Sequence, residues 1–258
     1  MNRYYAAAGV VCLILAGVFL VAALPNQEDD PLAESTPSPS VVQQEAEPPP
    51  PPVTEEPQYE SPIDFPALQA ENPDVYAWLS IKDAEIDYPV LRSTEDSQFY
   101  IDHNSAGRPS SAGALFTESE YNSAAFDDPV TIIYGHKTTT GTFFGNLQAI
   151  YSDSDSFAAH SSITVYLPDQ ELHYTVFAAV PYDKRHILYN YNFQSSRMYR
   201  AFLDSVYSVR AVDANFSEDI TVTEEDKLLI LSTCLKGDSS RRYLVLARLD
   251  QDHVSNGN

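Results

Sequence analysis

Basic residues are scarce in this sequence, and their scarcity excludes one large class of partners. The 258 residues include 37 Asp and Glu but only 15 Lys and Arg, which gives a formal net charge of −22. Binding to nucleic acid needs clustered Lys and Arg that neutralise phosphates. Cofactor and metal motifs are lacking as well, because the chain has no GxGxxG, P-loop or CxxC pattern and no histidine cluster with metal-ligand spacing. We therefore expect no nucleic-acid partner, no cofactor and no metal.

One long apolar run lies near the N-terminus. Residues 6–24 are 19 apolar or small residues without a charge, and as a helix they span roughly 28 Å, about the thickness of a bilayer core. A cleaved signal peptide is the competing interpretation, but its apolar core is usually shorter, about 7–15 residues, and its start more basic. Arg3 precedes the run and an acidic stretch follows it. The positive-inside rule then predicts a cytoplasmic tail at 1–5, a transmembrane anchor at 6–24 and an extracellular remainder.

Residues 25–62 have the composition of a spacer. They contain 11 of the 18 prolines, nine acidic residues and no Lys or Arg, so they bury too little apolar surface to fold. Their prolines favour extended polyproline II, in which a segment of this length reaches at most on the order of 100 Å. The segment is either a stalk that holds a domain away from the membrane or a disordered spacer without a length requirement, and composition does not separate the two.

The folded domain is expected at 63–258, and its hydrophobic pattern is mainly that of strands. A short helix is predicted at 63–72, where Pro73 ends it. Helices are also predicted at 141–151 and at 195–209, the second from apolar positions close to a 3.6-residue period. Strands are predicted at 78–81, 85–92, 130–136, 163–168, 171–180, 227–234 and 243–249. Many strands at short spacing indicate an all-β barrel or sandwich.

The chain has two cysteines, and the predicted topology keeps them apart. Cys12 lies in the apolar run, whereas Cys234 lies in the exported part. An exported thiol without a partner pairs between chains, reacts, or is a small buried hydrophobe. A reactive thiol needs a neighbouring histidine or other cation that lowers its pKa, and it needs a donor for the oxyanion of the intermediate.

Three residues at the ends of predicted strands are candidates for that chemistry. His136 and Cys234 each end a strand, and Arg242 opens the next strand at about the level of Cys234. Each also has a plain structural explanation, since a strand-end histidine can bond a loop and Arg242 can be a surface charge beside Arg241. His103, in a loop-like run, is the main rival to His136, and the other four histidines are assigned no role.

Several segments, taken together, resemble class B sortases. The string TIIYGHKTTTGTFFGNL at 131–147 is similar to their histidine segment, and LILSTC at 229–234 followed by RYLVLARL at 242–249 is similar to their Cys and Arg strands. The stretch 74–116 resembles their opening strands, so the resemblance covers roughly residues 62–250. A helix at 195–209 has the place of the class B insertion.

This resemblance implies a closed sortase-type β-barrel of about eight strands, with an N-terminal helix and an extra helix at about 195–209. It implies a cysteine transpeptidase of the cell membrane, facing the cell wall. Cys234 would attack an LPxTG- or NPxTN-like sorting signal of a surface protein, and a peptidoglycan precursor amine would resolve the thioester. His136 would act as general acid and base, and Arg242 would stabilise the oxyanion. Ser232 and Thr233 either bind substrate at this site or only complete the strand.

Other functions are also compatible with this sequence. The chain can be a non-catalytic wall or adhesion module in which Cys234 is a packed core residue. Among enzymes, a pilus-assembling sortase or a mainly hydrolytic thiol peptidase is the runner-up. An L,D-transpeptidase is disfavoured because no SHG…GC-type arrangement surrounds Cys234.

Overall fold

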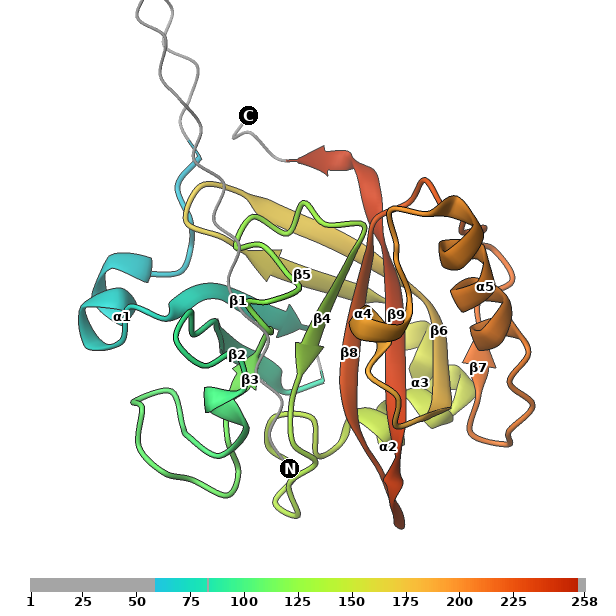
Figure 1. Ribbon diagram of the computed structural model, residues 1–258, viewed down its shortest axis with the longest axis horizontal. Coiled ribbons are helices and arrows are strands. Elements are labelled where there is room, and N and C mark those ends of the chain that lie inside the picture. Colours follow the sequence, from blue (N-terminus) through green and yellow to red (C-terminus); the bar gives the residue numbers. More distant parts are fainter. Residues whose placement is uncertain (1–58, 83, 255–258) are drawn as a thin grey trace, which may run out of the picture. The chain divides into compact units, whose positions relative to one another are not determined.

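A sheet of nine strands closes on itself in the computed structural model, which describes residues 59–82 and 84–254 (Figure 1). The predicted tail, the membrane span and the spacer up to residue 58 lie outside these residues. Within the described part, no helix has the length and apolar character needed to cross a membrane.

The strands are β1 (Val75–Ile81), β2 (Ile86–Leu91), β3 (Leu115–Phe116), β4 (Val130–Tyr134), β5 (Ser162–Tyr166), β6 (Glu171–Asp183), β7 (Asn215–Phe216), β8 (Leu228–Leu235) and β9 (Asp238–Val254). Their order is β5-β1-β2-β3-β4-β8-β9-β6-β7, and an additional β5–β6 pairing joins the first eight into a ring. The pairs β2–β3 and β4–β8 are parallel, while the others are antiparallel. The expected barrel of about eight strands is confirmed, with β7 added at the edge of β6.

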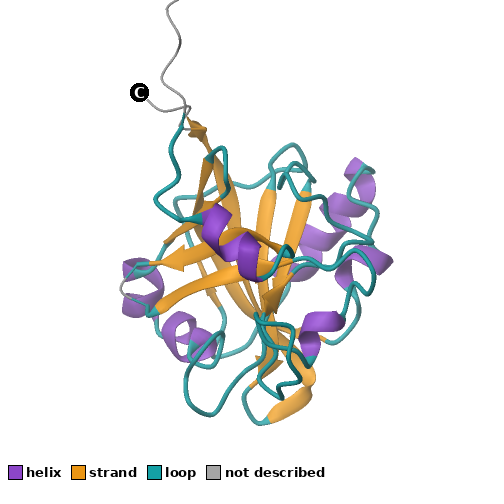
Figure 2. Ribbon diagram, turned by 90° about the vertical axis from the view of Figure 1, so that its left-hand side faces the viewer, coloured by secondary structure: helices purple, strands orange, loops and turns teal. Residues whose placement is uncertain are grey.

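The helices lie on the outside of this barrel (Figure 2). They are α1 (Phe65–Glu71), the 3-10 turn η1 (Phe99–Ile101), α2 (Leu147–Ser152), α3 (Ser154–Ala159), α4 (Ile187–Asn190) and α5 (Ser196–Tyr207). Asp64 caps α1 by accepting from the backbone N–H of Ala67 at 3.0 Å, and the helix ends before Pro73 as predicted. The expected N-terminal helix and the extra helix at about 195–209 are both present, the latter as α5.

The helix predicted at 141–151 is shorter than expected. Gly141 and Phe143 have φ values of +80° and +52°, which no right-handed helix contains. The chain therefore turns over 141–146, and α2 begins only at Leu147. The apolar residues of this stretch still contribute to the core, because Phe144 is fully buried.

Hydrophobic residues pack on both faces of the barrel wall. Successive side chains of a strand point to opposite faces, and on β8 Leu229 and Leu231 belong to the cluster that fills the barrel. Leu228 and Ile230 belong instead to a second cluster, which includes the buried face of α5. Ser232 and Cys234 continue this face of β8 beyond Ile230, and neither belongs to the two clusters.

Candidate active site

Cys234 lies near the end of β8, on the face that continues from Ile230. Its thiol is free and half-buried. A tight turn at Lys236–Gly237 joins β8 to β9, and Gly237 has a φ of +82°, a value that favours glycine. The register makes Cys234 and Arg242 direct partners across the hairpin, with an irregularity immediately after Cys234. The sequence predicted that Arg242 opens this strand. In the structure β9 begins at Asp238, so Arg242 lies inside it.

The guanidinium of Arg242 approaches the sulfur of Cys234. The distance from Arg242 Nη1 to Cys234 Sγ is 3.8 Å. The same nitrogen donates to the carbonyls of Ser239 at 3.3 Å and Arg241 at 3.4 Å, which fix its position above the hairpin. A permanently charged group with several donors next to a thiol can stabilise both the thiolate and a developing oxyanion.

His136 follows β4 by two residues and is held by a backbone carbonyl. Its Nε2 lies 2.6 Å from the carbonyl oxygen of Ile101. Because a carbonyl only accepts, Nε2 carries the proton, and Nδ1 is the atom that can take up or release another one. The neighbouring Gly135 N–H donates to the Ser232 carbonyl at 3.1 Å and so continues the β4–β8 pairing beyond the strand.

One cavity brings all five predicted residues together. It has a volume of about 180 Å³, and its lining includes His136, Cys234, Arg242, Ser232 and Thr233. Thr233 is 2% exposed, and its hydroxyl has no hydrogen-bond partner among the described residues. A buried hydroxyl without a partner loses about 1–3 kcal/mol.

The rival histidine lies outside this cavity. His103 Nδ1 is 2.6 Å from an Asp102 carboxylate oxygen and 2.9 Å from the Phe99 carbonyl, and its ring stacks on Phe99 with centroids 3.9 Å apart. These contacts explain the position of His103 without a catalytic role.

The cavity also contains two residues that the sequence did not indicate, Glu118 and His186. They are 68 positions apart, and their side chains meet at 2.6 Å. Burial, and secondarily the Glu118 carboxylate, raises the pKa of the adjacent Tyr134 far above its ordinary value, so its phenol stays protonated. No local signal marks Glu118 and His186, because each stands in a stretch without a recognisable motif.

A closed barrel that presents a thiol, an arginine and a histidine to one cavity has the layout of a cysteine transferase or peptidase. A family model described as a sortase domain matches residues 79–250. The curated Sortase B of Listeria monocytogenes is 30% identical over 176 residues, which cover 68% of each chain.

Solved structures agree with this match. Sortase B from Bacillus anthracis in complex with AAEK1 has a TM-score of 0.63 and 26% identity, covering 76% of this chain and 89% of that one. A Streptococcus pyogenes class B sortase involved in pilus biogenesis has a TM-score of 0.61 and 27% identity, covering 73% and 98%. The chain belongs to the sortase family of cysteine transpeptidases, and the resemblance to class B is confirmed.

Proposed function

We propose that Cys234 cleaves the C-terminal sorting signal of a surface protein and carries the acyl group as a thioester, and that a cell-wall precursor amine then receives it. Cysteine transpeptidation that anchors surface proteins to the cell wall is the chemistry of the family to which the chain belongs. The observation that carries the residue assignment is the 3.8 Å approach of Arg242 to the Cys234 sulfur, in a cavity that His136 also lines.

In the first half-reaction the Cys234 thiolate attacks the scissile carbonyl carbon. Arg242 donates to the carbonyl oxygen as it becomes negative, and the C–N bond then breaks. The leaving amine takes a proton from His136, whose Nδ1 is the atom left for exchange while Nε2 donates to Ile101. In the second half-reaction the acceptor amine attacks the thioester, gives a proton to His136 and expels the thiolate.

Ser232 and Thr233 are proposed to bind the sorting signal. Both line the cavity next to the thiol. LPxTG- and NPxTN-like signals are the substrate classes to test.

The proposed location is the outer face of the cell membrane. We assign 1–5 to a cytoplasmic tail, 6–24 to a single-pass anchor, 25–62 to a stalk or spacer and 63–258 to the catalytic domain. The uncharged apolar run and the acidic flank behind it support this order. Cell fractionation of the full chain and of a chain lacking 6–24 tests it, because only the full chain should sediment with membranes.

The residue assignment is tested with the purified full chain and a panel of sorting-signal peptides. We expect an acyl-enzyme by intact mass, its absence in Cys234→Ala, and losses of orders of magnitude in His136→Ala and Arg242→Ala. Arg241→Ala is the matched control, because Arg241 is exposed and is the sequence neighbour of Arg242. An inactive Arg241→Ala beside a normal Arg242→Ala would show that the wrong arginine was chosen.

Pilus assembly is the second candidate, favoured by the similarity to the Streptococcus pyogenes class B sortase involved in pilus biogenesis. In that case the acceptor is a lysine side chain of a protein rather than a precursor amine. Competition between a glycine peptide and a lysine-containing peptide for the preformed acyl-enzyme separates the two, because the physiological acceptor class resolves the thioester faster.

A further inference from the structure

Glu118 places a buried carboxylate in the wall of the catalytic cavity. It follows β3 by two residues and is 3% exposed. Both of its oxygens are used: Gln98 Nε2 donates to Oε1 at 2.9 Å, and His186 Nε2 lies 2.6 Å from Oε2. A buried carboxylate without such partners is strongly unfavourable, so Gln98 and His186 both help to hold Glu118 in place.

His186 binds on both sides of its ring. Its Nδ1 accepts the backbone N–H of Tyr189 at 3.1 Å, which makes His186 the N-cap of α4. An accepting Nδ1 requires the proton to be on Nε2, and Nε2 then donates to the Glu118 carboxylate. One imidazole therefore joins the segment after β3 to the first turn of α4.

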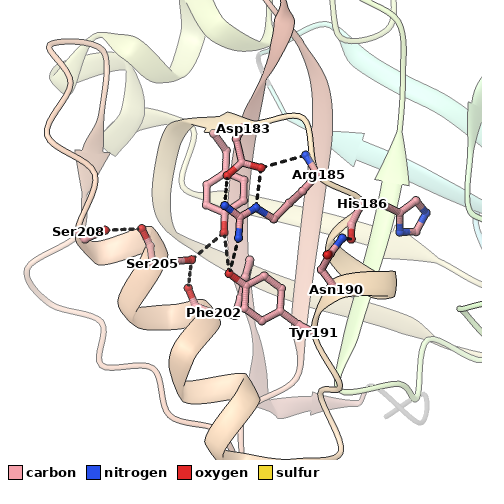
Figure 3. A network of polar contacts seen from close by, with 9 residues as sticks. Asp183, Arg185, His186, Asn190, Tyr191, Phe202, Ser205 and Ser208 are labelled. Carbon is pink, nitrogen blue, oxygen red and sulfur yellow. Dashed lines mark hydrogen bonds and ion pairs between the residues drawn. The ribbon is translucent and has the colours of Figure 1, made fainter.

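The connection from β6 to α5, residues 184–195, contributes Lys184, Arg185, His186 and Ile187 to the lining of the cavity. Its far side is held by a separate network, in which Arg185 pairs with Asp183 at 2.7 Å and approaches the Tyr191 hydroxyl (Figure 3). Figure 3 shows the His186 ring pointing away from that network. His186 is thus the residue that reaches from this connection to the wall containing Glu118.

We propose that Glu118 and His186 are positioning residues that set the width of the cavity in which the sorting signal lies. This inference rests on the proposed function. Without the pair, His186 no longer ties the cavity side of this connection to Glu118, and the substrate must order it on binding, which lowers affinity. The reacting groups keep their own supports, because Arg242 is fixed by the β8–β9 hairpin and His136 by the Ile101 carbonyl. The pair should therefore act on KM and leave kcat nearly unchanged.

The test uses substitutions that separate the two bonds of His186. His186→Asn keeps an acceptor for the Tyr189 N–H, since Asn is a favoured N-cap residue, but its shorter side chain loses the donor to Glu118. We expect KM for the sorting-signal peptide to rise about tenfold with kcat within about twofold, consistent with the loss of a hydrogen bond to a charged group. His186→Gln, which can still donate to Glu118, should recover much of the wild-type KM.

A double variant tests whether an unpaired buried charge, and not the loss of the contact itself, causes the change in KM. The double variant Glu118→Gln with His186→Asn leaves no buried charge and should show the same rise in KM. The matched control is His173→Asn, which removes a pair of the same chemistry, His173 Nε2 to Glu171 Oε1 at 3.1 Å, at a position outside the cavity. Its kinetics should equal those of the wild type.

The outcomes are distinct. An unchanged KM in both His186→Asn and the double variant overturns the inference, and so does a fall in kcat at constant KM, which would place the pair in the chemistry. A wild-type chain that forms no acyl-enzyme overturns the proposed function itself. Amide exchange of residues 184–190 without peptide gives an independent measure, because losing the pair should speed it at least tenfold in the His186→Asn chain but not in the His173→Asn chain.

Discussion

Gly113 lies where an added methyl group disturbs the support of the candidate catalytic histidine. Its φ is +60°, and a Cβ at this position lies 2.6 Å from the Tyr100 carbonyl oxygen, 2.8 Å from the Ile101 carbonyl oxygen and 3.1 Å from His136 Cδ2. The Ile101 carbonyl is the atom that accepts from His136. Gly113→Ala therefore presses on His136 and on its hydrogen-bond partner together.

Gly107→Ala supplies the matched control. Gly107 has a φ of +69°, and a Cβ there meets nothing within 4 Å. Both substitutions place alanine in the left-handed region, at about 1 kcal/mol each. At Gly113 the contacts add about 1–3 kcal/mol of overpacking. With roughly 2–4 °C per kcal/mol for a domain of this size, Tm should fall by about 2–4 °C in Gly107→Ala and by roughly 4–16 °C in Gly113→Ala.

Thermal unfolding and the rate of acyl-enzyme formation measure the two consequences separately. Since displacements of about 1 Å can reduce a rate by on the order of a hundredfold, acylation by Gly113→Ala should fall at least about tenfold at a temperature where the variant is folded. Acylation by Gly107→Ala should match the wild type. Equal Tm values and equal rates in the two variants would refute the assignment of Gly113 as a contact of the His136 site.

Three further outcomes follow from the packing. Gly135→Ala puts a Cβ 2.4 Å from a Leu115 methyl and 2.5 Å from the Phe144 ring, so urea unfolding should show a loss of about 1–3 kcal/mol, which an added Phe144→Leu partly restores. Phe202→Ala removes a fully buried ring from the contact of α5 with the barrel and should lower the free energy of unfolding by about 3–5 kcal/mol. Burial raises the pKa of Tyr100 to about 12. The stabilisation from the protonated Tyr100 phenol is therefore complete below about pH 10 and is lost as the pH rises from 10 towards 12. The urea midpoint should fall less steeply over that pH range in Tyr100→Phe than in the wild type.

Most of the barrel was predictable because its long strands carry a clear period. More than four residues with an alternating or apolar pattern form each of the strands β1, β2, β4, β5, β6, β8 and β9. Apolar clusters pack on both faces of the sheet that these strands form. β3 and β7 have two residues each and α4 has four, and elements of that length have no measurable period. Their positions are set by tertiary contacts such as the Phe116–Tyr134 pairing of β3 with β4.

The candidate site also has a part that the sequence predicts and a part that it does not. Cys234 and Arg242 are eight positions apart on one hairpin, so strand geometry alone brings them to the same level. His136 reaches them through the β4–β8 pairing. The apolar pattern at 130–136 predicts a buried strand, but only the family resemblance indicates that this strand lies beside β8. Glu118 and His186 meet across 68 positions through loops, where neither period nor motif indicates a contact.

The parallel β4–β8 pair determines when, during folding, the candidate catalytic residues come together. His136 and Cys234 are 98 positions apart in the sequence, and closing a loop of that length opposes their meeting by on the order of 4 kcal/mol. β9 must also be in place, because it pairs with β8 on one side and β6 on the other and provides Arg242. A folding chain therefore has Cys234 without Arg242 beside it until β9 has docked. The candidate site is thus assembled only when the barrel is completed.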